Sequence, residues 1–241
     1  MCANMTSMIY ESNHWCFAMI VALAFLLWPF SRKTLPHPEP QEAQDGGEEP
    51  VIDHVDWGIR LGMIGRFERA AERFEQAVRA DPEDLSAHYN QGLALDQAGD
   101  HKRARDAYNR AIEIDSTFAD VHTNLGLALL DMGENKAAMK SLEKAVELDS
   151  GDPVPHFDLG CIYLSKKQWR KAVSEFGEAV KADPKDAQTR FNLAIALRRA
   201  GSSADAEREL RDFLALARGR YPEQRAFATK LLSEEYEDKG E

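Results

Sequence analysis

The chain has 241 residues and a formal net charge of −11, but its acidic side chains are unevenly distributed. Residues 34–59 carry −7 and residues 233–241 carry −4, whereas residues 60–232 are close to neutral at −1. Without a basic stripe to neutralise phosphates, nucleic acid is excluded as an expected partner. The three cysteines are odd in number and widely separated, so neither a disulfide framework nor a zinc site is expected.

A stretch without charge, residues 15–30, follows a short N-terminal extension at residues 1–14. As a helix it would be about 24 Å long, against about 30 Å for the hydrocarbon core of a bilayer. Trp15 and Trp28 bracket the stretch as interfacial aromatic residues do, and Arg32 and Lys33 follow it directly. We predict a single-pass transmembrane anchor with the N-terminus outside and the rest of the chain in the cytoplasm.

The main alternative for residues 15–30 is a cleavable signal peptide, which would make the protein exported or periplasmic. The first fourteen residues contain Glu11 and neither Lys nor Arg, so the basic region that precedes such a peptide is missing. The next segment, residues 31–50, is rich in Pro, Gly and acidic residues and has too few apolar side chains to form a core. It is expected to be an extended acidic linker.

From residue 51 onward the sequence repeats itself with a period of 34 residues. Each period has a small residue in its first half, an alanine in its second half and a large apolar residue four positions after that alanine. Self-similarity at this period indicates an array in which each unit buries its apolar face against its neighbours. The three registers are Gly58, Gly92, Gly126, Gly160 and Ala194; Ala70, Ala104, Ala138, Ala172 and Ala206; and Phe74, Tyr108, Leu142, Phe176 and Leu210.

Each period is predicted to contain two helices separated by a helix-breaking position, and prolines such as Pro82 and Pro184 mark the ends of two units. We predict five repeats, at 51–84, 85–118, 119–152, 153–186 and 187–218, and a capping helix at 221–237. The helix-breaking positions are Gly65, Gly99, Gly133, Lys167 and Gly201.

The glycines in the first helix of each repeat lie where glycine costs about 1 kcal/mol relative to alanine. We expect that cost to be offset by close approach of the two helices of one hairpin, backbone against backbone, with the alanines of the second helix as small counterparts.

The repeated pattern resembles the tetratricopeptide repeat over residues 51–218. Two repeats carry its motif most fully: Trp57, Gly58, Leu61, Ala70, Phe74 and Pro82, and then Leu159, Gly160, Tyr163, Ala172, Phe176 and Pro184. The resemblance implies an all-α, right-handed α-solenoid of five helix-turn-helix repeats, here preceded by one transmembrane helix and followed by a capping helix.

One position departs from the motif: where the family often has tryptophan, this chain has His54, His88, His122, His156 and then Arg190. Histidine is a common metal ligand, but equivalent residues on stacked helices lie about 8–10 Å apart, too far for one ion to bind three of them. We therefore expect a packing role, no metal site and no cofactor. Ser141 and Lys144 have the S-x-x-K spacing of some hydrolases, but nothing else of such a site accompanies them. No nucleophile elbow or phosphate-binding loop is found either, so we expect no catalytic residues, no enzyme activity and no small-molecule substrate.

A polar register lies two positions before each small residue, and the resemblance implies that this face of the first helices lines a concave groove. A row of asparagine side chains could bond the backbone of an extended peptide, or it could tie adjacent helices together. Apolar positions beside it would supply binding energy. The predicted peptide-binding residues are Asp56, Asn90, Asn124, Asp158, Asn192, Tyr89, Phe157, Phe191, Leu93 and Leu127.

These features predict a membrane-tethered scaffold that binds a protein or peptide segment in the groove of the repeat array. Binding to the acidic tail of a chaperone is disfavoured, because only Asn90 matches the basic and amide residues with which some family members hold such a tail. An exported assembly factor and a non-catalytic regulatory or substrate-presenting subunit of an enzyme complex remain alternatives. Self-association of the arrays also remains open.

Overall fold

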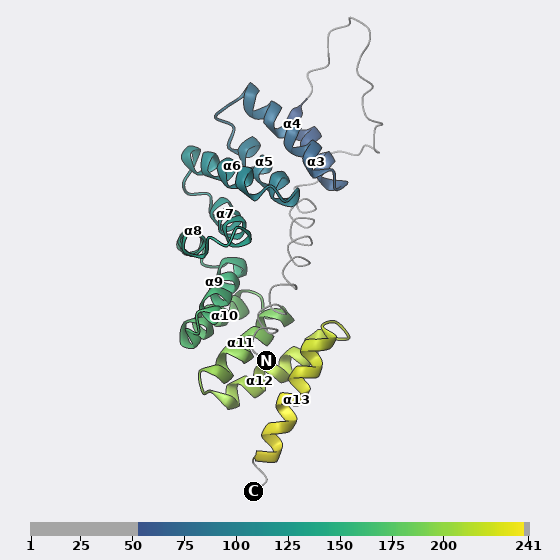
Figure 1. Cartoon of the computed structure of the whole chain (residues 1–241), viewed down its shortest axis with the longest axis vertical. Helices are drawn as coiled ribbons and strands as arrows, with labels where there is room; N and C mark the ends of the chain where they lie inside the picture. The colour runs from purple at the N-terminus through teal and green to yellow at the C-terminus, as the bar shows by residue number, and fades with distance from the viewer. Residues whose placement is uncertain (1–52, 239–241) are drawn as a thin grey trace, which may run out of the picture. The chain divides into compact units, whose positions relative to one another are not determined.

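The computed structural model of the protein describes residues 53–238, and every regular element in that range is an α-helix (Figure 1). The chain forms two compact units, one ending at Ile114 and the other beginning at Asp115. The predicted anchor at residues 15–30 and the linker at 31–50 lie outside the described residues. Between residues 53 and 238 no helix is both long enough and apolar enough to cross a membrane.

The unit that ends at Ile114 contains two helical hairpins. Its helices are α3 (His54–Met63), α4 (Phe67–Ala80), α5 (Leu85–Gln97) and α6 (His101–Ile114). Within this unit, α4 contacts both α3 and α5, and α3 also contacts α5. We call α3 and α5 first helices and α4 and α6 second helices.

The unit that begins at Asp115 contains three hairpins and one further helix. Its helices are α7 (Ala119–Asp131), α8 (Asn135–Leu148), α9 (Pro153–Ser165), α10 (Trp169–Ala182), α11 (Ala187–Arg199), α12 (Ser203–Ala217) and α13 (Pro222–Asp238). The middle first helix, α9, contacts the first helices α7 and α11 and the second helices α8 and α10. First and second helices therefore form two layers in this unit.

Most first helices begin at an aspartate that caps them. The Asp84 carboxylate accepts a hydrogen bond from the Ala87 amide at 3.1 Å, and the Asp186 carboxylate accepts one from the Thr189 amide at 2.9 Å. Such caps satisfy amide groups that have no partner inside the helix. Because α3 is capped by Asp53, it begins three residues later in the repeat register than α5, and it has 10 residues against 13.

Two residues after each first helix ends, the chain has a residue with a left-handed backbone conformation. The glycines at the predicted helix-breaking positions have φ between 75° and 90°, and Lys167 has φ 58°. At Lys167 the amide bonds to the Leu164 carbonyl at 3.0 Å, and the Gln168 amide bonds to the Tyr163 carbonyl at 2.9 Å. This pair of bonds closes the helix end in the same way at all five positions, glycine or not.

The first-helix glycines make room for a side chain, and this corrects the expectation of backbone packed against backbone. A Cβ atom added at Gly58 or Gly160 would lie 2.6 Å from the ring of Phe74 or Phe176, respectively. At Gly126 the nearest atoms belong to the Leu142 side chain at 2.7 Å, while the nearest backbone atom, the Ala138 carbonyl oxygen, is 3.5 Å away. The large residue of each second helix therefore sets the requirement for glycine.

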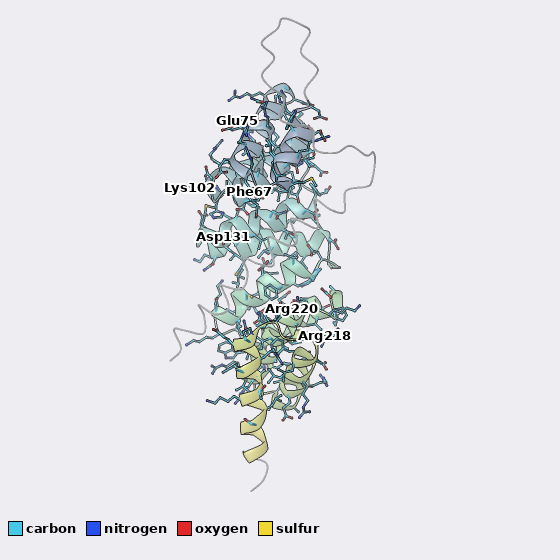
Figure 2. The ribbon with its side chains drawn as sticks, turned by 90° about the vertical axis from the view of Figure 1, so that its right-hand side faces the viewer. Phe67, Glu75, Lys102, Asp131, Arg218 and Arg220 are labelled. Carbon is cyan, nitrogen blue, oxygen red and sulfur yellow. The ribbon has the colours of Figure 1, made fainter. Side chains whose placement is uncertain are left out.

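The C-terminal helix α13 packs against the last hairpin (Figure 1). Arg218 and Tyr221 have φ of 35° and 58°, so the chain changes direction between α12 and α13, at the turn that carries Arg218 and Arg220 (Figure 2). Ala228 and Leu231 of α13 join a cluster of buried residues with Phe191 of α11. The α13 helix thus covers apolar surface that α11 and α12 would otherwise expose.

Candidate peptide-binding face

The predicted polar register does not form a uniform row of free side chains. In the first unit Asp56 is exposed and pairs with Arg60, whose Nε atom is 2.7 Å from the Asp56 carboxylate. Asn90 is 9 % exposed, and its amide nitrogen donates to the Ser86 carbonyl at 2.8 Å and to the Ser86 hydroxyl at 3.1 Å. Both donor hydrogens of Asn90 are therefore used inside its own helix, and its side-chain oxygen is the atom left for a further partner.

In the second unit the three residues of this register have different environments. The Asn124 amide nitrogen donates to the Asp120 carbonyl at 2.9 Å, one helical turn earlier. Asp158 is 5 % exposed, and Asn192 is fully buried with neither polar side-chain atom bonded to another described group. Asn192 is thus out of reach of a guest in this conformation.

Burial raises the pKa values of two side chains on α9. The pKa of Asp158 is raised to about 8, chiefly by burial and further by the Asp152 and Asp131 carboxylates. Burial and the Asp158 charge also raise the pKa of the Cys161 thiol, three residues further along α9. Asp158 therefore holds a proton at neutral pH, and near pH 7 it can act as a hydrogen-bond donor.

Two of the predicted aromatic anchors are partly exposed and rest on buried rings. The Tyr89 ring lies 6.4 Å from the ring of Tyr108, and the Phe157 ring lies 5.8 Å from that of Phe176, both measured between centroids. Each pair joins the first and second helices of one hairpin. The second-helix ring fixes the position of the first-helix ring, which keeps part of its surface in solvent.

The predicted apolar lining is smaller than the sequence suggested. Leu127 is partly exposed, but Leu93 and Phe191 are each only 7 % exposed. Phe191 is buried because its ring packs against Phe213 of α12 at 5.1 Å and against Phe227 of α13 at 6.4 Å. Phe191 and Leu93 are therefore core residues in this conformation, and Tyr89, Leu127 and Phe157 are the accessible members of the set.

Histidines at the repeated position, and the arginine that replaces them in the last repeat, bond to the turns that precede their helices. The repetition alone predicted only a packing role. The Nε2 atoms of His88 and His122 each lie 3.0 Å from the carbonyl oxygen six residues earlier, at Pro82 and Ser116. A carbonyl can only accept, so the imidazole N–H donates. Each side chain thus ties a first helix to the turn that precedes it. Arg190 makes the same bond from Nε to the Pro184 carbonyl at 3.0 Å.

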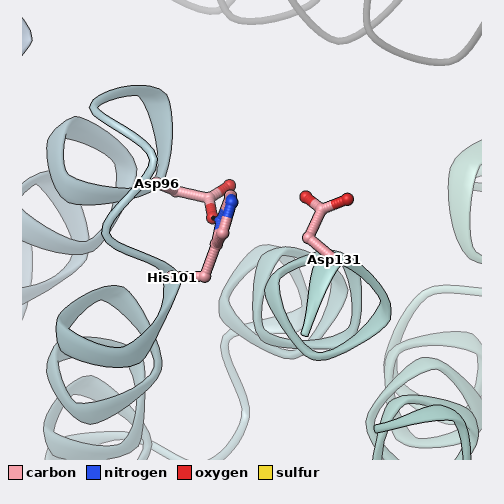
Figure 3. Close-up of side chains that lie close together, drawn as sticks. All are labelled: Asp96, His101 and Asp131. Carbon is pink, nitrogen blue, oxygen red and sulfur yellow. Dashed lines mark hydrogen bonds and ion pairs between the residues drawn. The ribbon is translucent and has the colours of Figure 1, made fainter. Parts of the chain in front are cut away.

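Two side chains at this repeated position also pair with acidic residues of the second helix, and these pairs were not predicted from the sequence. His156 Nδ1 lies 2.9 Å from Glu175, and Arg190 Nη1 lies 2.7 Å from Glu209. Both glutamates lie nineteen positions after their partner, on the second helix of the same hairpin. Another histidine, His101, pairs with Asp96 at 2.7 Å across the turn between α5 and α6 (Figure 3). These contacts hold hairpins together.

Sequence reasoning also missed a basic hollow, which we define by Lys167, Trp169, Arg170, Lys171 and Arg199. The five side chains line a surface depression of about 550 Å³ where the turn before α10 meets the end of α11. The near-neutral charge of residues 60–232 concealed it, because acidic residues elsewhere in the array balance these cations. The run Lys-Lys-Gln-Trp-Arg-Lys at residues 166–171 was the available signal.

Helical hairpins of 34 residues, closed by left-handed turns and held by a small residue opposite a large one, define a class of α-helical repeat proteins. A family model described as tetratricopeptide repeat matches residues 55–117 and 157–220, and a second such model matches residues 95–156. The chain belongs to the tetratricopeptide repeat family. No curated protein matches the sequence.

Solved structures share this fold at low sequence identity. A structure titled MamA 41-end from Desulfovibrio magneticus RS-1 is 22% identical, with a TM-score of 0.63, over 70% of this chain and 95% of that one. YrrB, whose title describes a tetratricopeptide repeat protein with an unusual peptide-binding site, is 22% identical with a TM-score of 0.61, over 75% and 92%. These similarities support the fold.

Proposed function

We propose that the protein is a membrane-tethered scaffold that binds an extended peptide segment on its first-helix face. The observation that carries the proposal is a partly exposed ring on a first helix of each unit, Tyr89 in the first and Phe157 in the second, each held in place by a buried ring of the same hairpin. Rigid aromatic side chains lose little conformational entropy on binding and are frequent anchors for peptide guests.

A polar group beside Tyr89 supports an extended guest. Asn90 follows Tyr89 in the sequence, and its side-chain oxygen can accept a hydrogen bond from a backbone amide. Asp158, which follows Phe157, is 5 % exposed and is as buried as the core residues of the set, so it is not part of the proposed contact. A strand-like segment with spaced apolar side chains fits this chemistry, and peptide binding by YrrB, as its title describes it, provides a precedent within the same fold.

The binding proposal is tested by selecting peptides from a phage-displayed library on the full chain in detergent and measuring their affinity for variants. We expect Tyr89→Ala and Phe157→Ala to weaken binding about tenfold or more, as removal of an aromatic anchor does. Phe67→Ala is the control, because Phe67 is partly exposed but lies on a second helix. Equal losses in all three variants, or none in the first two, would reject the first-helix face as the site.

The membrane tether is a proposal from residues 15–30 alone, with the array placed on the cytoplasmic side by Arg32 and Lys33. Protease treatment of sealed vesicles tests the tether and its direction together. We expect the array to be digested only when the protease has access to the cytoplasmic face. Release of the array by alkaline washing would contradict a spanning anchor, and digestion from the opposite face would reverse its orientation.

A further inference from the structure

One face of α11 is buried although the same face of α9 is partly exposed. On α11 this face, which we call the α11 stripe, is formed by residues that recur at spacings of three and four, namely Gln188, Phe191, Asn192 and Ile195. All four are 7 % exposed or less. At the equivalent positions of α9, Asp158 is buried, whereas Val154, Phe157 and Cys161 are partly exposed. Something therefore covers the α11 stripe that does not cover α9.

The C-terminal helix α13 supplies a cover. Ala228 and Leu231 of α13 belong to the same buried cluster as Ile195. The ring of Phe227, also on α13, lies 6.4 Å from the ring of Phe191. Phe227 and Leu231 are four residues apart, so their side chains project from one face of α13. The α11 stripe thus already receives the apolar face of a helix, which in this structure comes from the same unit.

The α11 stripe also carries polar atoms that have no partner among the described residues. Neither polar side-chain atom of Asn192 forms a hydrogen bond to a described group, and neither does the side-chain oxygen of Gln188. Ala228 and Leu231, the α13 members of the cluster, have no polar side-chain atoms to offer. Buried polar groups without a partner disfavour the packed arrangement. A helix with a polar side chain beside its apolar face would suit the stripe better than α13 does.

The turn that leads into α13 is strained. Arg218 has φ 35° and Tyr221 has φ 58°, and a left-handed backbone is unfavourable for side chains this large (Figure 2). Release of α13 allows both residues to return to ordinary backbone angles. Because the strain and the unbonded polar atoms both oppose the apolar packing of α13, we expect this helix to detach more readily than the helices of the repeats.

We propose that α13 is a displaceable occupant of the α11 stripe, and that the stripe binds an amphipathic helix of a partner protein in its place. The partner helix carries two large apolar residues four positions apart, as Phe227 and Leu231 are, and a polar side chain that bonds Gln188 or Asn192. This site is distinct from the peptide-binding site proposed above, because neither aromatic anchor of that site takes part in it. The two proposals are therefore tested separately.

Hydrogen exchange of the full chain in neutral detergent tests whether α13 detaches by itself. We expect the amides of residues 226–232, away from the ends of α13, to exchange at least about tenfold faster than those of α11 and α12. Exchange of α13 and α12 at the same rate would show that α13 opens only together with the last hairpin, and it would overturn the proposal.

Two arginines of the turn provide a matched pair of variants. Glycine adopts a left-handed backbone without steric cost, so Arg218→Gly should slow the exchange of α13 about fivefold. Arg220→Gly makes the same change at an exposed residue whose φ is not positive, and it should not slow the exchange. If both variants slowed the exchange equally, or if neither did, the turn would not favour release and the proposal would be overturned.

A labelled synthetic peptide of residues 221–238 serves as the partner helix. It should bind the wild-type chain only weakly, because α13 competes for the stripe at an effective concentration of roughly millimolar or more. Phe227→Ala in the chain weakens this internal competitor, so we expect it to raise the affinity for the unaltered peptide at least about fivefold. Thr229→Ala changes an exposed residue of α13 and should leave the affinity within about twofold. Equal affinities for all three chains would overturn the proposal.

Substitution of Asn192 tests the role of the polar atoms. Asn192→Leu removes them, so it should hold α13 more firmly and slow the exchange of α13 relative to α12 several-fold. Asn124→Leu makes the same change at the equivalent position of α7 and should leave the ratio unchanged. Sedimentation then separates a partner protein from a second copy of this chain. Dimers of the wild type that Phe227→Ala abolishes would assign the stripe to α13 of another copy and overturn the proposal.

Discussion

The ring of Phe176 occupies the space into which a side chain at Gly160 would project, with 2.6 Å between its Cε1 atom and an added Cβ. The two residues lie on the two helices of one hairpin, α9 and α10. Because contacts this short do not occur between real Cβ atoms and their neighbours, one of the two residues must remain small or move. In the last hairpin the equivalent residues are Ala194 and Leu210, both buried, so alanine and leucine fit together at this pair of positions in that hairpin.

Gly160→Ala should lower the free energy of unfolding by about 1–3 kcal/mol, because it overpacks the contact with Phe176. Gly177→Ala is the control: Gly177 lies inside α10 with nothing within 4 Å of an added Cβ, so that change should stabilise by up to about 1 kcal/mol. Urea unfolding followed by circular dichroism measures both.

The double variant Gly160→Ala, Phe176→Leu tests the cause of the Gly160→Ala effect. It recreates the pairing of Ala194 with Leu210, so we expect its stability to exceed the sum of the two single changes by about 1 kcal/mol or more. Purely additive losses would show that the ring is not what makes alanine unfavourable at this position.

Lys167→Gly should stabilise the protein by about 1 kcal/mol, because Lys167 has φ 58° where the equivalent positions have glycine. Gly133→Ala is the reciprocal change and should destabilise by about 1 kcal/mol, since φ there is 75°. Urea unfolding measures both effects: the midpoint of each variant is compared with that of the wild type. A loss of stability in Lys167→Gly would mean that contacts of the lysine side chain outweigh its backbone strain.

Local features of the fold could be predicted from the sequence, because each depends on a few neighbouring residues. The helix ends at Gly99 and Gly133, and the identification of Lys167 as their equivalent, follow from one repeated position whose backbone must be left-handed. The residue that requires Gly92 could not be predicted from spacing alone. The sequence places both Ala104 and Tyr108 on the facing helix, and the structure shows that the Tyr108 ring is the neighbour.

Residues in one register looked equivalent in the sequence but have different environments in the structure. Tyr89 and Phe157 are partly exposed, whereas Phe191 is buried because α13 supplies Phe227 as a neighbour. The register cannot encode this difference, since it arises from a helix outside the repeats. The hollow around Trp169 was missed for a related reason: it draws cations from α10 and α11, and only their arrangement in space brings them together.

The stability of the protein should fall as pH rises from about 4 to about 8, and Asp158 should account for part of the fall. Its pKa is about 8 in the folded chain and about 3.9 in an unfolded one, so between these values the folded state binds more protons. Under linkage, the unfolding free energy then decreases with pH by up to about 1.4 kcal/mol per unit. The total effect is of the order of a few kcal/mol.

Asp158→Asn should flatten this dependence and raise stability at pH 8, because a neutral amide carries no ionisation cost. Asparagine already occupies the same register at Asn192. Glu72→Gln removes one negative charge from an exposed position on α4, and its slope should match that of the wild type. Thermal unfolding at several pH values provides the test, and identical slopes for Asp158→Asn and the wild type would contradict a raised pKa.

Arg190→Ala should destabilise the last hairpin by about 3 kcal/mol, because it removes the close partner of the buried Glu209 carboxylate and leaves the exposed Arg208, 3.9 Å away, as its remaining described cation. The side chains of the two residues are 15 % and 10 % exposed, and their charged atoms lie 2.7 Å apart. Removing both charges should cost less than removing one, so Arg190→Ala with Glu209→Gln is expected to recover part of the loss. Hydrogen exchange of α11 and α12 amides, compared with those of α7 and α8, reports whether the effect is local. If the double variant were as unstable as Arg190→Ala, the loss would come from the Arg190 bond to the Pro184 carbonyl, which tethers α11 to the preceding turn.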